Sequence, residues 1–128
     1  MMQAKSALVL SLGLLFLGPA VVTAQQGPEL ERLRARVTPE AYERLATALV
    51  QAEQARVPTE PLVNKALEGV AKRVPEDRIV RVVERLRESL VQARAMLETA
   101  GVSAPSAAAI AGVASALERG APRDAVQA

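Results

Sequence analysis

Apolar residues recur every three or four positions through most of the chain after residue 37, which is the spacing of one helix face. The clearest case is the stretch 75–99, whose apolar stripe consists of Ile79, Val83, Leu86, Leu90, Ala93 and Leu97. Pro75 suits the first helical position, where its missing N–H is not needed, and Gly101 suits the position after the last turn. The pattern predicts one long helix over residues 75–99.

The same stripe could form the seam of a dimeric coiled coil, and the flanking positions favour another interpretation. Val80, Val82 and Met96 are apolar at positions where a two-stranded coil usually carries charges. Val91 widens the apolar surface further. A helix this broadly apolar is typical of the middle of a bundle, so we expect neighbouring helices on two or three of its sides.

Shorter helices are predicted before and after this stretch. Thr38 is a suitable N-cap for a helix ending near residue 56, with an apolar stripe of Tyr42, Leu45, Leu49 and Ala52. Two more helices are expected over residues 58–72 and 105–119. Their inward residues should be Leu62, Val63, Ala66, Leu67 and Val70 in the first, and Ile110, Val113, Ala114 and Leu117 in the second. No segment alternates at strand spacing, so no sheet is expected.

The positions of the prolines suggest an internal repeat. A spacing of 47 residues separates Pro28 from Pro75, Pro75 from Pro122, and Pro58 from Pro105. A period of this size is typical of solenoids built from two-helix repeats. Because short connections make consecutive helices antiparallel, the predicted fold is all-α. It is either a small antiparallel helical bundle or a two-unit α-solenoid of helix pairs around one long central helix.

The first 24 residues have the character of a secretory signal peptide. Lys5 precedes a short apolar run from Ala7 to Leu17, and Val22 and Ala24 supply small residues before a cleavage site. The run is about half the ~20 residues that a membrane-spanning helix needs. We therefore expect cleavage after Ala24, export to the periplasm or the extracellular space, and no transmembrane segment in the mature protein.

These predictions divide the chain into four segments. They are a signal peptide (1–24), a charged and partly helical lead-in (25–37), a helical domain (38–119) and a short C-terminal helical stub or tail (120–128). The mature chain keeps 15 of the 16 Lys and Arg and all 14 Asp and Glu, so its net charge is +1. That balance is not typical of a protein that binds nucleic acid.

The residue inventory argues against catalysis. The chain has no His and no Cys, which removes Ser-His and Cys-His dyads and metal sites built on imidazole or thiolate. The two aspartates, Asp77 and Asp124, follow prolines at matching repeat positions; they could form a paired acid site, but they also suit the positive ends of helices. Glu84 and Glu88 could hold a cation or simply form a solvated face. We predict no enzyme, no cofactor and no catalytic or metal-binding residue.

One candidate site remains, a ridge of arginines on the predicted 75–99 helix. Its members are Arg78, Arg81 and Arg85. The ridge could dock an acidic partner or an anionic lipid surface. Intrahelical pairing is the alternative, with the pairs Asp77–Arg81, Glu84–Arg87 and Arg94–Glu98.

Together these observations favour an exported, non-enzymatic interaction or scaffold module of the bacterial envelope, with an unknown protein partner. A periplasmic chaperone or stress sensor is the first alternative, and an envelope-associated protein that uses the Arg ridge on anionic surfaces is the second. A weak homodimer is also expected, through the flank of the 75–99 helix or the open C-terminal end. Short alanine-rich partners leave part of that helix uncovered, and uncapped solenoid ends tend to find partners.

Overall fold

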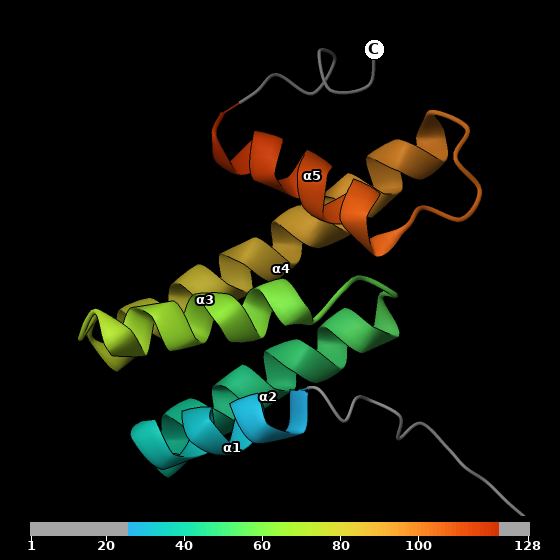
Figure 1. The fold of residues 1–128 in the computed structure, drawn as a ribbon. Helices are drawn as coiled ribbons and strands as arrows, with labels where there is room; N and C mark the ends of the chain where they lie inside the picture. Colours follow the sequence, from blue (N-terminus) through green and yellow to red (C-terminus); the bar gives the residue numbers. More distant parts are fainter. Residues whose placement is uncertain (1–25, 121–128) are drawn as a thin grey trace, which may run out of the picture.

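The computed structural model describes residues 26–120, and every regular element in that range is an α-helix (Figure 1). The helices are α1 (Gln26–Arg36), α2 (Pro39–Gln54), α3 (Glu60–Ala71), α4 (Glu76–Thr99) and α5 (Ala107–Glu118). The all-α prediction is confirmed for this part of the chain. The predicted signal peptide and all but Gly120 of the predicted C-terminal stub lie outside the described residues.

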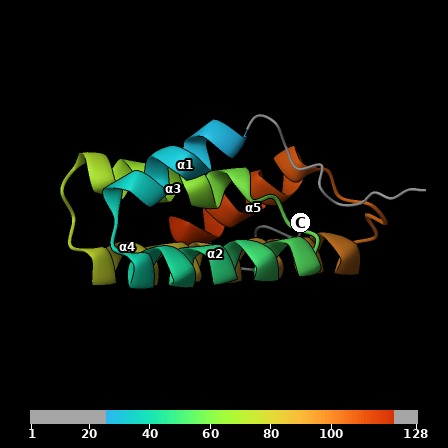
Figure 2. The same cartoon turned by 90° about the horizontal axis from the view of Figure 1, so that it is seen from below.

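The helices form two layers (Figure 2). α1, α3 and α5 lie on one side, and α2 and α4 lie on the other. α4, with 24 residues, is the longest helix in the described range and packs against α2, α3 and α5. Helices that follow one another in sequence run in opposite directions, so α2 and α4 run parallel (Figure 1).

Polar contacts tie α2 and α4 together along their length. At the N-terminal ends, the backbone N–H and the hydroxyl of Thr38 donate to the Glu76 carboxylate. At the C-terminal ends, the Arg94 guanidinium donates to the Arg56 carbonyl at 2.9 Å. Both pairs are 38 residues apart in sequence. The two helices therefore keep one register from end to end.

The core is built around the broad apolar face of α4. Ile79, Val83, Leu90 and Ala93 from the predicted stripe are buried, and Leu86 and Leu97 pack partly buried against them. The flanking residues Val80 and Met96 are buried as well. The buried face is therefore wider than the seam of a coiled coil, and helices from both layers cover it.

The buried face of α2 differs from the predicted one. The buried residues are Ala41, Leu45, Ala48 and Ala52. Tyr42 and Leu49, which belong to the predicted stripe, are only half-buried. Alanines next to the core let α2 approach its neighbours closely, while the Tyr42 ring lies at the edge of the core, 5.5 Å from the guanidinium carbon of Arg34.

Three of the helices end in the same hydrogen-bonded motif. Gly101 has a φ of 101°, and the N–H after it, that of Val102, donates to the Leu97 carbonyl at 2.9 Å. This is the Schellman arrangement, in which a residue with positive φ closes the helix. It confirms the predicted role of Gly101. α2 and α3 end in the same way, but arginines occupy the strained position, with φ values of 60° at Arg56 and 58° at Arg73.

The predicted 47-residue spacing is seen in one of the two helix pairs that can be compared. α3 begins at Glu60 and α5 at Ala107, 47 residues later, whereas α1 begins at Gln26 and α4 at Glu76, 50 residues later. Pro122, the last proline of the longer series, lies outside the described residues. A duplication with a 47-residue period stays a prediction.

Candidate partner-binding groove

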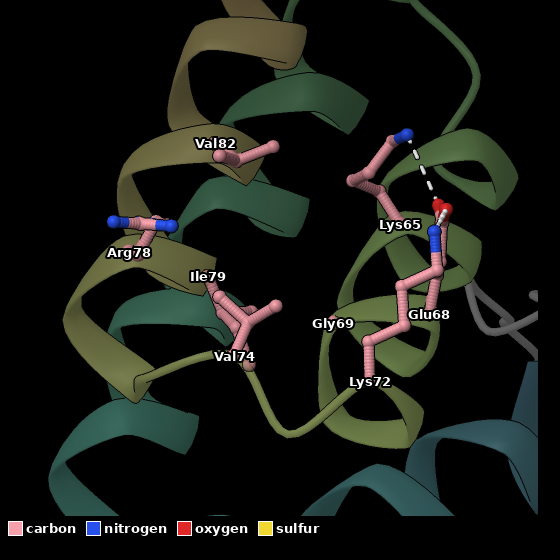
Figure 3. Close-up of a pocket in the computed structure, with 8 residues that line it drawn as sticks. All are labelled: Lys65, Glu68, Gly69, Lys72, Val74, Arg78, Ile79 and Val82. Atoms are coloured by element: carbon pink, nitrogen blue, oxygen red, sulfur yellow. Dashed lines mark hydrogen bonds and ion pairs between the residues drawn. The ribbon is translucent and has the colours of Figure 1, made fainter.

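Two adjoining pockets open between α3 and the helices next to it. The first lies between the C-terminal half of α3 and the start of α4 and has a volume of about 180 Å³ (Figure 3). Apolar surface from Val74, Ile79 and Val82 lines it, together with the bare backbone at Gly69. Gly69 leaves this space because a Cβ there would come within 2.8 Å of the Ile79 side chain.

Charged side chains surround the apolar part of this pocket. Lys65, Glu68 and Lys72 extend from α3, and Arg78 lies on the α4 side (Figure 3). Glu68 accepts hydrogen bonds from Lys72 at 2.7 Å and from Lys65 at 3.1 Å. The two lysines hold the pKa of this carboxyl at about 2, below its ordinary 4.5. Glu68 therefore stays ionised through the neutral and mildly acidic range.

The second pocket continues along α4 toward α5. Its apolar lining comes from Leu86 and Leu90 of α4 and from Ala111 and Ala114 of α5. Asn64, Ser115 and Glu118 lie at its polar edge, and its volume is about 350 Å³. Lys65 and Glu68 line both pockets. We call the two pockets together the α4 groove.

The three arginines of the predicted ridge differ in their position relative to the α4 groove. All three are exposed on α4, but only Arg78 lines the first pocket. Arg81 and Arg85 line neither part of the α4 groove. The three positions are spaced by three and four residues and share one face of α4, so the ridge as a docking surface stays a prediction.

The intrahelical pairing expected for these charges forms in one case of three. Arg94 and Glu98 pair at 3.1 Å. Glu84 instead meets Arg44 of α2 at 3.6 Å, which adds a contact between the two parallel helices. Asp77 and Arg81 form no ion pair within the part of the chain that is described.

Lys65, Glu68 and Lys72 were not singled out from the sequence. The signal was present, since lysines three residues before and four residues after a glutamate share one helix face with it. That spacing predicts a charged cluster on α3. It does not predict that Arg78, from another helix, lies across a pocket from the cluster, because this depends on how α3 and α4 pack.

The described helices contain neither a membrane-spanning segment nor a group of metal ligands. Within residues 26–120, no helix combines the length and the apolarity that a bilayer crossing requires. Over the same range, no three His, Cys, Asp or Glu side chains gather as they would around a metal ion. Asp124 lies outside these residues, so a site shared with Asp77 is not described.

Comparisons with protein-family models, curated proteins and solved structures find no match for this chain.

Proposed function

We propose that this protein is an exported, non-enzymatic interaction module that binds a partner protein through the α4 groove. The observation that carries the proposal is the continuity of the two pockets, which share Lys65 and Glu68 and have α4 side chains in their lining. Apolar surface with a charged edge is typical of protein-binding sites. The side chains of the groove include no nucleophile paired with a base, so they do not favour a catalytic role.

Site-specific photo-crosslinking in the organism that encodes the protein tests this function. A benzophenone amino acid at Asn64, an exposed residue at the edge of the second pocket, should capture a protein in the envelope. The same probe at Val50, half exposed on α2 and outside the groove, is the matched control. Protein capture from residue 64 alone supports the proposal. Capture from neither position, or equally from both, contradicts it.

Export is part of the proposal and rests on the signal-like residues 1–24. When the full chain is expressed in a bacterium, the mature protein should appear outside the cytoplasm and begin at Gln25. Mass spectrometry of the intact protein from each cell fraction measures this directly. An uncleaved chain that stays in the cytoplasm would contradict export and leave the α4 groove to be considered in another compartment.

A periplasmic chaperone or stress sensor is the second candidate, and the apolar lining of the groove favours it. A chaperone of this kind needs a contiguous apolar surface and, as we expect here, a homodimer. Sedimentation of residues 25–128 over a roughly hundredfold range of concentration would detect the weak dimer. A dimer that also suppresses aggregation of an unrelated unfolded protein favours the chaperone. A monomer without this activity favours the interaction module.

A further inference from the structure

The α4 groove follows the axis of α4 for about three helical turns. Its lining includes a row of four apolar residues on α4, at intervals of three, four and four: Ile79, Val82, Leu86 and Leu90. Val82 and Leu86 are partly exposed, and the two outer residues of the row are buried. At about 1.5 Å per residue, this row is roughly 16 Å long. Three turns of a partner helix span the same length, and helices with apolar side chains at such spacings dock in hydrophobic grooves.

The charge around the groove is unequal from end to end. At the first pocket, three cations (Lys65, Lys72 and Arg78) face one carboxylate, Glu68, which is already bonded to both lysines. No carboxylate lies within ion-pair distance of Arg78 among the described residues. The second pocket shares Lys65 and Glu68 with the first and adds one charged residue, Glu118, which accepts a hydrogen bond from Ser89. One end of the groove is therefore basic.

We propose that the α4 groove binds an acidic amphipathic helix of the partner protein, with carboxylates beside Arg78, Lys65 and Lys72 and apolar side chains against Val82 and Leu86, the partly exposed residues of the α4 row. This deepens the proposed function and depends on it. The charges favour such a helix over a basic or neutral one, because opposite charge across an interface sets specificity and speeds association.

An anionic membrane fits these observations less well. Arg81 and Arg85 are equally exposed on α4, so a membrane attracted to basic charge alone would use them as well as Arg78. The apolar surface is concave and has a charged edge, so side chains must enter it to make contact.

A synthetic peptide tests the inference directly. The probe is an N-acetylated peptide of about 18 residues, with leucines at heptad spacing and glutamates beside them. Two controls have the same length: one with the residues scrambled, and one with lysine in place of each glutamate. Titration calorimetry with the full mature chain should show binding of the acidic amphipathic peptide that exceeds both controls by about tenfold or more.

Matched variants assign the binding to the groove. Arg78→Glu should weaken binding by about tenfold, whereas Arg81→Glu, on the same helix but outside the groove, should change it by less than about twofold. Val82→Asp should weaken binding through the apolar row, with Val91→Asp on another face as its control. Circular dichroism confirms that each variant is folded before its affinity is compared.

Several results would overturn the inference. Equal affinity for all three peptides would show that the charge and pattern of the peptide do not matter. An equal loss of affinity in Arg78→Glu and Arg81→Glu would show that binding does not take place in the groove. Anionic phospholipid vesicles that bind better than the acidic peptide would point to a membrane instead. If the residue-64 probe captures a protein whose cross-linked segment is basic, or whose capture survives Arg78→Glu, the acidic helix is excluded. The proposed function would survive that result, because it fails when residue 64 captures no protein or captures no more than the control at residue 50.

Discussion

Glu76 lies at the first residue of α4 and is bound by Thr38, the N-cap of α2. Its two carboxylate oxygens accept from the Thr38 N–H at 2.9 Å and from the Thr38 hydroxyl at 2.8 Å. The same hydroxyl accepts from the Ala41 N–H at 3.3 Å, which caps α2. One carboxylate therefore serves the positive ends of two parallel helices at once.

This shared contact should be measurable as a coupling between the two residues. Glu76→Ala should lower the free energy of unfolding more than Asp77→Ala does. Both residues are acidic in the first turn of α4, so the helix-dipole contribution is common to them. A double-mutant cycle with Thr38→Val should give a coupling of about 1 kcal/mol by urea denaturation. Additive effects would mean that the cross-helix bonds contribute little in solution.

Two helical glycines should respond in opposite ways to alanine. Gly69→Ala places a Cβ 2.8 Å from Cγ1 of Ile79, which is 4% exposed and branched at Cβ. Overpacking should outweigh the gain in helix propensity and lower stability by about 1 kcal/mol. Gly112→Ala meets no atom within 4 Å, so it should raise stability by about 0.5–1 kcal/mol. Thermal unfolding of both variants checks the contrast, and a stabilising Gly69→Ala would contradict the close α3–α4 packing.

Replacing Arg73, which follows α3 with a positive φ, by glycine should stabilise the folded protein. Arg73 has a φ of 58°, which costs a residue with a Cβ about 1–2 kcal/mol relative to glycine's freedom there. Part of this gain is offset by the larger entropy of glycine in the unfolded chain. Arg73→Gly should therefore raise the free energy of unfolding by up to about 1 kcal/mol. The control Arg81→Gly, in the middle of α4, should lower it by about the same amount.

The lowered pKa of Glu68 should depend on its two lysine partners. Lys72 contributes most to the lowered value of about 2, and Lys65 contributes next. Lys72→Gln should therefore raise the pKa toward 4.5 by more than Lys65→Gln does, and Arg73→Gln should leave it nearly unchanged. Carboxyl NMR during an acid titration measures each value.

The sign of the associated stability change follows from the same shift. The folded-state pKa of Glu68 lies below its ordinary value, so the contribution is present above pH 4.5 and is lost as the pH falls toward 2. Because the pair is exposed, added salt should weaken this pH dependence. A Glu68 pKa that stays at 4.5 in the unmutated protein would contradict the paired geometry.

Several local features could be predicted from the sequence, because each depends on residues within a few turns. Thr38 caps α2 through its side chain, and Gly101 takes the positive φ that ends α4. The wide apolar face of α4 also follows from its own residues. The predicted helix boundaries differ by one or two residues, as with Pro75, which is the N-cap of α4 instead of its first residue.

The inward face of α2 shows where this approach fails. The apolar spacing of Tyr42, Leu45, Leu49 and Ala52 is regular, but the buried set is shifted to Ala41 and Ala48 at two of its positions. Hydrophobicity alone favours burial of the larger side chains. Close packing beside α4 favours burial of the smaller ones, so the buried face of α2 depends on its neighbouring helix.

The sequence by itself determined that the described chain is helical, because the three-to-four-residue period and the capping residues act within each segment. The tertiary structure alone decided that α2 and α4 lie side by side in one register and that Glu76 reaches Thr38, 38 residues away. It also decided that Arg78 lies across a pocket from Lys65 and Lys72. Which residues distant in sequence come into contact depends on which helices pack together, and that arrangement depends on side-chain packing over the whole core.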